Sequence, residues 1–186
     1  IYDHQLFDVK MNIDFQTIIY GDGFIGLSLS PRHSIQAKKS LWDIYGSRDE
    51  MVKKRFEIRG VKVRSIHDMR LYFVKDVLDK SVDEPLEELK GFSIKDIFKK
   101  YSFSPDEPVV LVNIGGVSTC IPPSLLYRIY DLHELKKLGV SRDVYNCIRR
   151  SLYNWPNIAE KIVGDINPIS FLDHEIFFES RFIDEV

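Results

Sequence analysis

The chain has 186 residues, of which 44% are hydrophobic and 12% aromatic, a composition typical of a folded protein and not of a disordered one. This length accommodates one domain, or one domain with linkers, and is sufficient to bury a core. A net charge of −2 argues against unspecific binding of nucleic acid over the whole surface.

The sequence lacks the patterns of a membrane, secreted or metal-binding protein. No stretch approaches the ~20 apolar residues of a membrane span, and no signal-peptide core is present. Cys120 and Cys147 fit neither a metal-site spacing nor a disulfide framework. We therefore expect a cytoplasmic protein with free thiols, no membrane partner, no metal and no cofactor. The first residue is Ile1 and not methionine, so we also expect a fragment or a processed N-terminus.

Basic residues concentrate in one part of the chain. Residues 32–75 hold 12 lysines and arginines against 5 acidic residues, whereas the remainder holds 14 basic and 23 acidic residues. Such a sector can face nucleic acid, but charge runs such as residues 53–55 also occur on any solvated helix face. Charge alone leaves both interpretations open.

The N-terminal third predicts strands and then two short helices. An edge strand is expected within residues 1–12, and apolar runs at 15–20 and 24–29 flank Gly21-Asp22-Gly23, which is typical of a hairpin. Ser40 with Asp43, and Ser47 with Glu50, have the spacing of capping boxes on either side of the helix breaker Gly46. The second helix is expected to carry the apolar residues Met51, Val52 and Phe56.

The middle of the chain predicts two strand pairs with a helix between them. Residues 56–66 alternate as a strand with a bulge at Gly60, and His67-Asp68 is expected to turn into a partner strand at residues 70–78. In that partner strand, Leu71, Phe73 and Val77 should face one way, and Arg70, Tyr72 and Val74 the other. Residues 79–90 are expected to form an acidic loop or short helix.

Residues 91–130 predict a capped helix and then a hairpin. Ser93 stands three residues before Asp96, so it can cap an amphipathic helix. A strand at residues 109–112 and the Gly115-Gly116 turn predict the hairpin, which Pro122-Pro123 ends because proline cannot donate to a sheet. Beyond it we expect a packed apolar segment at residues 125–132, helices opened by Ser141 and Asn154, and an aromatic-rich segment at residues 172–182.

The order of these motifs resembles the PAZ domain of the Argonaute and Piwi family. Residues 97–100 and 120–126 are similar to the family's helix end and its proline-containing strand end, and residues 56–63 and 69–74 resemble its first strands. Residues 24–45 and 133–138 resemble the linkers on either side, most like those of archaeal and bacterial Argonautes.

The resemblance implies an α+β fold. We expect a small PAZ-like (OB-like) β-barrel with an inserted helix–hairpin module. It would be flanked by a hairpin-and-helix linker and a C-terminal helical linker. The corresponding boundaries are residues 1–55 for the N-terminal linker, 56–123 for the PAZ-like domain and 124–186 for the C-terminal linker.

The resemblance also implies a function in nucleic-acid-guided silencing or defence. The chain would bind the 3′ region of a single-stranded guide, RNA or DNA, and work with a MID–PIWI lobe in the same or another chain. We expect no catalysis, because the family's nuclease centre belongs to the PIWI domain. The nucleic-acid-binding residues implied are Arg64, Arg70, Tyr72, Lys99, Lys100 and Tyr101.

Three positions depart from the family's pattern. Its helix tyrosine falls on Ile97, its strand tyrosine on Cys120 and its glutamate after the proline on Ser124. An alternative is therefore a PAZ-like scaffold that docks a partner MID–PIWI lobe without binding a strand end. A third reading is an unrelated α+β domain.

Overall fold

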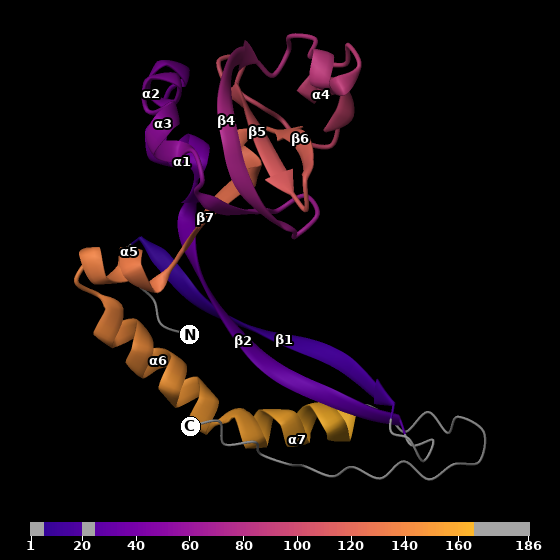
Figure 1. The fold of residues 1–186 in the computed structure, drawn as a ribbon, viewed down its shortest axis with the longest axis vertical. Helices are drawn as coiled ribbons and strands as arrows, with labels where there is room; N and C mark the ends of the chain where they lie inside the picture. Colours follow the sequence, from indigo (N-terminus) through magenta and orange to yellow (C-terminus); the bar gives the residue numbers. More distant parts are fainter. Residues whose placement is uncertain (1–5, 20–24, 166–186) are drawn as a thin grey trace.

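A computed structural model describes residues 6–19 and 25–165, which form one antiparallel sheet with short helices around it (Figure 1). The seven described strands lie in the order β1-β2-β7-β3-β4-β5-β6. Their bounds are β1 Phe7–Ile19, β2 Ile25–Ser40, β3 Lys62–Ser65, β4 Leu71–Ser81, β5 Pro108–Ile114, β6 Val117–Ile121 and β7 Leu126–Tyr130. The helices are α1 Leu41–Tyr45, α2 Arg48–Lys53, α3 Arg55–Ile58, η1 Glu87–Leu89, α4 Ile94–Ile97, η2 Pro123–Leu125, α5 Leu132–Lys137, α6 Ser141–Tyr153 and α7 Trp155–Asp165.

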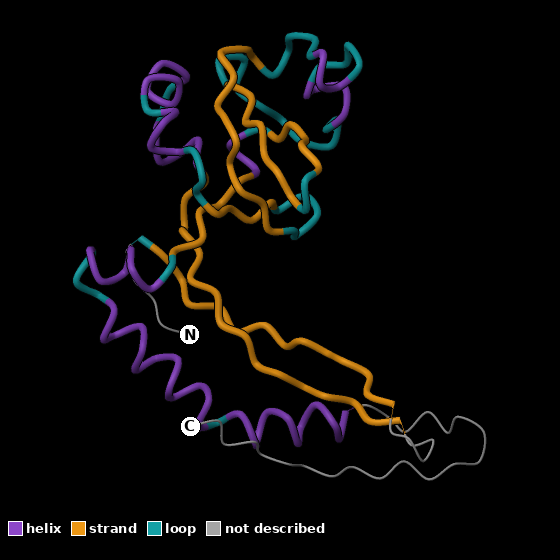
Figure 2. The backbone as a smooth tube through the Cα atoms, viewed as in Figure 1, coloured by secondary structure: helices purple, strands orange, loops and turns teal. Residues whose placement is uncertain are grey.

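The molecule has two parts, which we call the head and the arm. The head contains β3 to β6 with α1 to α4, and the arm is the long β1–β2 hairpin with α5 to α7 alongside it (Figure 1). Strand β7 pairs with β2 on one side and β3 on the other, so the strands run continuously from arm to head (Figure 2). The predicted α+β class is confirmed. The predicted barrel does not close among the described strands, because β1 and β6 are the ends of the pairing order.

The arm is an amphipathic hairpin. Phe7, Val9 and Ile35 are buried against Leu135 of α5 and Val144 of α6. The residues between them on the two strands are polar, and pairs such as Arg32 with Asp14 and Asn12 with Ser34 hold that face together. Alternation with a period of two therefore gives one covered and one open face.

The hairpin prediction is confirmed and extends further than expected. The 13 residues of β1 pair with β2 from Phe7↔Ala37 to Ile19↔Ile25, so residues 34–40 belong to a strand. The helix α1 begins only after Ser40, whose capping box with Asp43 is present. The Gly21-Asp22-Gly23 turn and the aromatic segment at residues 172–182 lie outside the described residues.

The strand predicted for residues 56–66 is wrong in its first half. Residues 55–58 form the helix α3, and only Lys62–Ser65 form a strand. Gly60 lies between them at φ +77°, and its N–H donates to the carbonyl of Val74. Phe56 is 68% exposed, and the guanidinium groups of Arg55 and Arg59 each lie 5.1 Å from the centroid of its ring.

The orientation predicted for β4 is wrong at one residue. Tyr72 and Val74 are buried while Leu71 and Phe73 face outward, but Val77 is buried with Tyr72 and Val74. A register shift against β5 between Val74 and Asp76 explains this, because an extra residue reverses the alternation that follows it. The sequence gives no glycine or proline to reveal this bulge.

The hairpin predicted within residues 91–130 is confirmed, but the helix before it is shorter than expected, because α4 ends at Ile97, which is 49% exposed. Ser93 and Asp96 form a reciprocal capping box at α4, and Gly115 and Gly116 turn β5 into β6 with positive φ. Helices α6 and α7 also follow the predicted positions. The apolar segment predicted after Pro123 is in fact the short η2 helix and the central strand β7.

Glu107 connects the loop after α4 to the end of the β5–β6 hairpin. Its carboxylate is 1% exposed, and its Oε1 accepts the N–H of Ser124 at 2.7 Å. Its backbone carbonyl accepts the N–H of Val82 at the end of β4. Burial raises the pKa of the Glu107 carboxyl, and the hydrogen bonds from Ser124 oppose this only partly.

We predict that Glu107→Gln makes stability less dependent on pH. A carboxyl whose pKa is raised by folding destabilises the folded state as pH rises from its unfolded pKa through its folded pKa. The glutamine oxygen can still accept the Ser124 N–H but carries no charge. Urea unfolding from pH 4 to pH 7 should show the variant gaining stability relative to the wild type. Parallel pH curves would contradict the prediction.

Candidate nucleic-acid interface

The turn between β3 and β4 is bridged by hydrogen bonds to Asp68. The Asp68 carboxylate accepts the hydroxyl of Tyr72 at 2.5 Å and the backbone N–H of Arg70 at 3.1 Å. Ser65 adds a hydrogen bond from the His67 N–H to its hydroxyl oxygen. Met69 takes a positive φ of 61°, which lets the chain turn back into β4. These bonds fix the position of His67 and Arg70.

Electrostatics favour the ionised form of Asp68. Burial raises the pKa of its carboxyl, but the hydrogen bonds from Tyr72 and Arg70 outweigh burial and leave the pKa below its usual range. Burial and the same hydrogen bond raise the pKa of the Tyr72 hydroxyl. The Tyr72–Asp68 bond therefore joins a neutral donor to a charged acceptor, which is the stronger class of hydrogen bond.

The imidazole of His67 meets aromatic rings from the segment after α4. Its centroid lies 4.8 Å from that of Phe98 and 5.8 Å from that of Tyr101, both in edge-to-face orientation. Tyr101 in turn contacts Phe103 at 6.2 Å. Such geometry is favourable for aromatic pairs. We call these four residues the aromatic cluster.

The capped helix α4 positions Phe98, the residue of the aromatic cluster that ends this helix. Ile94 is fully buried in the head, and the four-residue helix places Phe98 at its C-terminus with 7% of its surface exposed. The exposed Lys99 and Lys100 follow directly, and the Lys100 ammonium lies 5.0 Å from the centroid of the Tyr101 ring. Cations thus border a partly exposed aromatic surface.

The structure gathers some of the predicted site residues and separates others. Arg70 leaves the turn with a 68% exposed side chain, close in sequence to His67, and Lys99, Lys100 and Tyr101 follow α4. Tyr72 is 4% exposed, and its hydroxyl is bonded to Asp68. Arg64 lies on β3 opposite Leu71 and Tyr127, and no contact with the aromatic cluster is found among the described residues.

Sequence reasoning missed His67 as a site residue. It was expected only as a turn residue, and its contacts with Phe98 and Tyr101 join segments about 30 positions apart in the chain. Its position in a turn between a basic strand and the Arg70 motif was the available signal.

The departures from the family's pattern have distinct environments. Ile97 is 49% exposed at the end of α4. Cys120 is 1% exposed in the head, and burial raises the pKa of its thiol to about 11, so the thiolate is disfavoured.

Other features of the described chain contribute nothing to this site. A shallow cavity of about 540 Å³ lies where α6 meets α7, lined by Arg149, Arg150, Leu152, Tyr153 and Asn154. Within residues 6–19 and 25–165, no group of three His, Cys, Asp or Glu side chains could hold a metal ion. None of the described helices is long and apolar enough to cross a membrane.

No family model matches the sequence, and no curated protein sequence matches it. Solved structures do match the fold. The Argonaute of Methanocaldococcus jannaschii in complex with guide DNA aligns with a TM-score of 0.53 at 15% identity, over 78% of this chain and 22% of that one. The Argonaute of Clostridium butyricum, bound to guide DNA and a target DNA, aligns with a TM-score of 0.53 at 17% identity, over 78% of this chain and 21% of that one.

The chain therefore spans about a fifth of the Argonautes that it matches. The resemblance to archaeal and bacterial Argonautes, predicted from the order of short motifs, is confirmed at the level of the fold. This chain has the fold of a segment of an Argonaute.

Proposed function

We propose that this chain is the PAZ-like segment of an Argonaute-like protein, with linkers on both sides, and that it binds the 3′ region of a single-stranded guide. The observation that carries the proposal is the aromatic cluster, with Arg70, Lys99 and Lys100 beside it, on an Argonaute fold. The two Argonautes above are bound to guide DNA, which supports a guide as the ligand here. The guide is RNA or DNA.

The chemistry of the cluster suits the end of a single strand. A terminal base can stack on Tyr101 or His67, because every base has an aromatic face. The exposed cations beside the rings can hold phosphates, which makes affinity fall as salt concentration rises. Stacking and charge need no readout of base edges, so the site would accept any sequence.

Tyr72 acts in this proposal as a positioning residue. Its hydroxyl donates to Asp68 and so holds the turn that carries His67 and Arg70. Recognition of the end then depends on rings and cations more than on tyrosine hydroxyls. This agrees with Ile97 and Cys120 at the family's tyrosine positions.

We further propose that the chain works beside a MID–PIWI lobe in nucleic-acid-guided silencing or defence and carries no catalytic centre of its own. A second candidate function is a scaffold that docks this lobe without binding a strand end. The exposed apolar side chains of Phe92 and Ile97, 58% and 49% exposed, favour it because such residues commonly meet a partner.

The first prediction concerns recognition of the 3′ end. Tyr101→Ala and Arg70→Ala should each weaken binding of short labelled strands roughly 5- to 100-fold, because each removes a stacking surface or a phosphate contact. Fluorescence anisotropy with free and blocked 3′ ends, at two salt concentrations, measures the effect. In the wild type a blocked end should lower affinity, and Tyr101→Ala should remove this preference.

Matched controls are available on α6. Tyr145→Ala and Arg142→Ala change exposed residues of the same types away from the cluster, and neither should alter end preference. A wild type indifferent to blocking would refute the proposal. Loss of assembly with a MID–PIWI lobe in Tyr101→Ala, with strand binding unchanged, would favour the scaffold.

The second prediction concerns the turn. Tyr72→Phe removes the bond to Asp68 and should lower the free energy of unfolding at pH 7 by about 1.5 kcal/mol, as expected for a hydrogen bond to a charged group. The lowered pKa of Asp68 stabilises the fold above its unfolded pKa, and this stabilisation disappears as pH falls through its folded pKa. The difference between variant and wild type should therefore shrink in acid.

Urea unfolding at pH 7 and at pH 3 measures both effects. The control is Tyr153→Phe, since Tyr153 is 87% exposed and should tolerate loss of its hydroxyl. Equal stability of Tyr72→Phe and the wild type at pH 7 would show that the turn does not depend on this bond.

A further inference from the structure

Helix α6 of the arm has one side packed on the hairpin and one side turned away from it. On the packed side, Val144 is buried under the arm, and Ser151 is hydrogen-bonded to His33 of β2. Since the helix repeats every 3.6 residues, the remaining positions point outward. We call this side the outer face of α6. Its exposed side chains are Arg142, Tyr145, Arg149, Arg150, Leu152 and Tyr153.

The outer face is basic, and its cations are unpaired. Among residues 6–19 and 25–165, no carboxylate forms an ion pair with any of its three arginines. The helix has one acidic residue, Asp143. Tyr145 and Tyr153 are 62% and 87% exposed. Arginine and tyrosine are enriched in protein interfaces, so the outer face has the composition of a surface that takes an acidic and apolar partner.

A cavity lies at the end of the outer face, where α6 meets α7. Its volume is about 540 Å³, and its lining includes Arg149, Arg150, Leu152 and Tyr153. Binding pockets typically have roughly 300–1,000 Å³, so this cavity is large enough to receive an aromatic side chain. A carboxylate next to that side chain would meet the two arginines.

The residues that follow α7 have the complementary chemistry. We call residues 166–186 the acidic segment, which lies beyond the described part of the chain. It contains five acidic residues against one arginine, and four phenylalanines. Its acidic residues are Asp173, Glu175, Glu179, Asp184 and Glu185, and its phenylalanines are Phe171, Phe177, Phe178 and Phe182. The acidic segment therefore offers both carboxylates and rings to a basic, aromatic surface.

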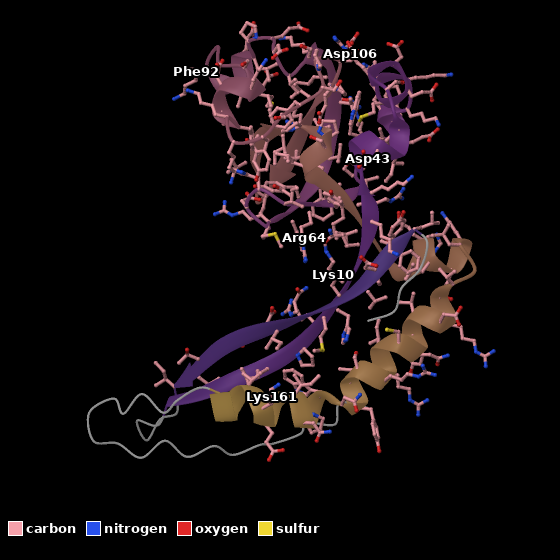
Figure 3. The ribbon with its side chains drawn as sticks, turned by 180° about the vertical axis from the view of Figure 1, so that it is seen from behind. Lys10, Asp43, Arg64, Phe92, Asp106 and Lys161 are labelled. Carbon is pink, nitrogen blue, oxygen red and sulfur yellow. The ribbon has the colours of Figure 1, made fainter. Side chains whose placement is uncertain are left out.

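The acidic segment is attached within reach of the outer face. Helix α7 has 11 residues and ends at Asp165, so it is roughly 16 Å long. Residues 166–170 span at most about 17 Å, which is enough to pass back along α7 to the cavity. Figure 3 shows Lys161 on α7, beside the half of the hairpin that is far from the head. Phe171 can thus reach the cavity, and the residues after it can reach the arginines of α6.

We propose that the acidic segment docks on the outer face of α6 in the same chain. A phenylalanine fills the cavity beside Tyr153, and the carboxylates pair with Arg149 and Arg150. Each exposed ion pair is weak, but a short tether gives an effective concentration in the millimolar range, so weak contacts are sufficient. Docking covers these cations and keeps other anions from this part of the arm. The inference is independent of the proposed function, which concerns the head.

Cleavage by chymotrypsin after the phenylalanines of the acidic segment tests the docking in the full chain. The protease needs the undocked segment, so the rate follows the population of that state. Arg149→Glu combined with Arg150→Glu should raise the rate roughly 3- to 10-fold, because two weak ion pairs are lost. Mass spectrometry identifies the cut sites. The matched control, Lys62→Glu with Lys75→Glu, reverses two exposed cations of the head and should leave the rate unchanged.

A charge exchange tests the same contact from the other side. Asp173→Lys combined with Glu175→Lys should also raise the cleavage rate, and adding the two α6 substitutions should restore the wild-type rate, because the charges are again opposite. Peptides of residues 166–186, with and without these substitutions, give the intrinsic rates of cleavage. Thermal unfolding checks the α6 variant, whose melting temperature should match that of the wild type because both arginines are exposed.

Each other outcome identifies a different occupant or none. Equal cleavage rates in the wild type and the α6 variant would overturn the proposal. Protection that increases with protein concentration would replace it by docking between copies of the chain. If the α6 variant keeps the wild-type rate but loses binding to a MID–PIWI lobe, the outer face belongs to that partner. Preference for a free 3′ end is measured separately, so failure of this inference leaves the proposed function untouched.

Discussion

The arrangement of the whole molecule depends on the pairing of one five-residue strand. Strand β7 pairs with β2 through contacts such as Ile35↔Tyr130, and with β3 through contacts such as Val63↔Arg128. The chain enters the head from β2 and leaves it through β7, so the two connections between head and arm are hydrogen-bonded to each other. Two separate hydrophobic clusters, one in the head and one in the arm, are thereby joined by a single sheet.

This continuity decides which surfaces are available for a ligand. Helices α5 and α6 pack on one face of the arm, and the core of the head fills one face of β3 and β4. The Asp68–Tyr72 bond then fixes the turn at the end of β3, where His67 meets the rings that follow α4. The partly buried hydrogen bond to Asp68 orders the turn, and the edge-to-face contact of His67 with Phe98 brings distant segments to one place.

The errors of sequence reasoning have physical causes. Residues 56–66 alternate like a strand, but in α3 the helical turn of Arg55–Ile58 buries Ile58 and exposes Phe56. The β4 bulge was invisible because its register is set by pairing with β5 and not by local residues. Strand β7 is short and flanked by η2 and α5, so its assignment depended on neighbours far away in sequence.

The sequence by itself determined the local elements of this protein. Capping boxes at Ser40 and Ser93, the Gly115-Gly116 turn and the period-two pattern of the arm all lie in contiguous residues, and local sterics and hydrogen bonds decide them. The order of motifs also determined the Argonaute resemblance. Only the tertiary structure decided that Tyr72 bonds Asp68, that His67 joins the aromatic cluster and that Arg64 lies opposite Tyr127 in the sheet. These depend on strand register and long-range packing, which no local pattern encodes.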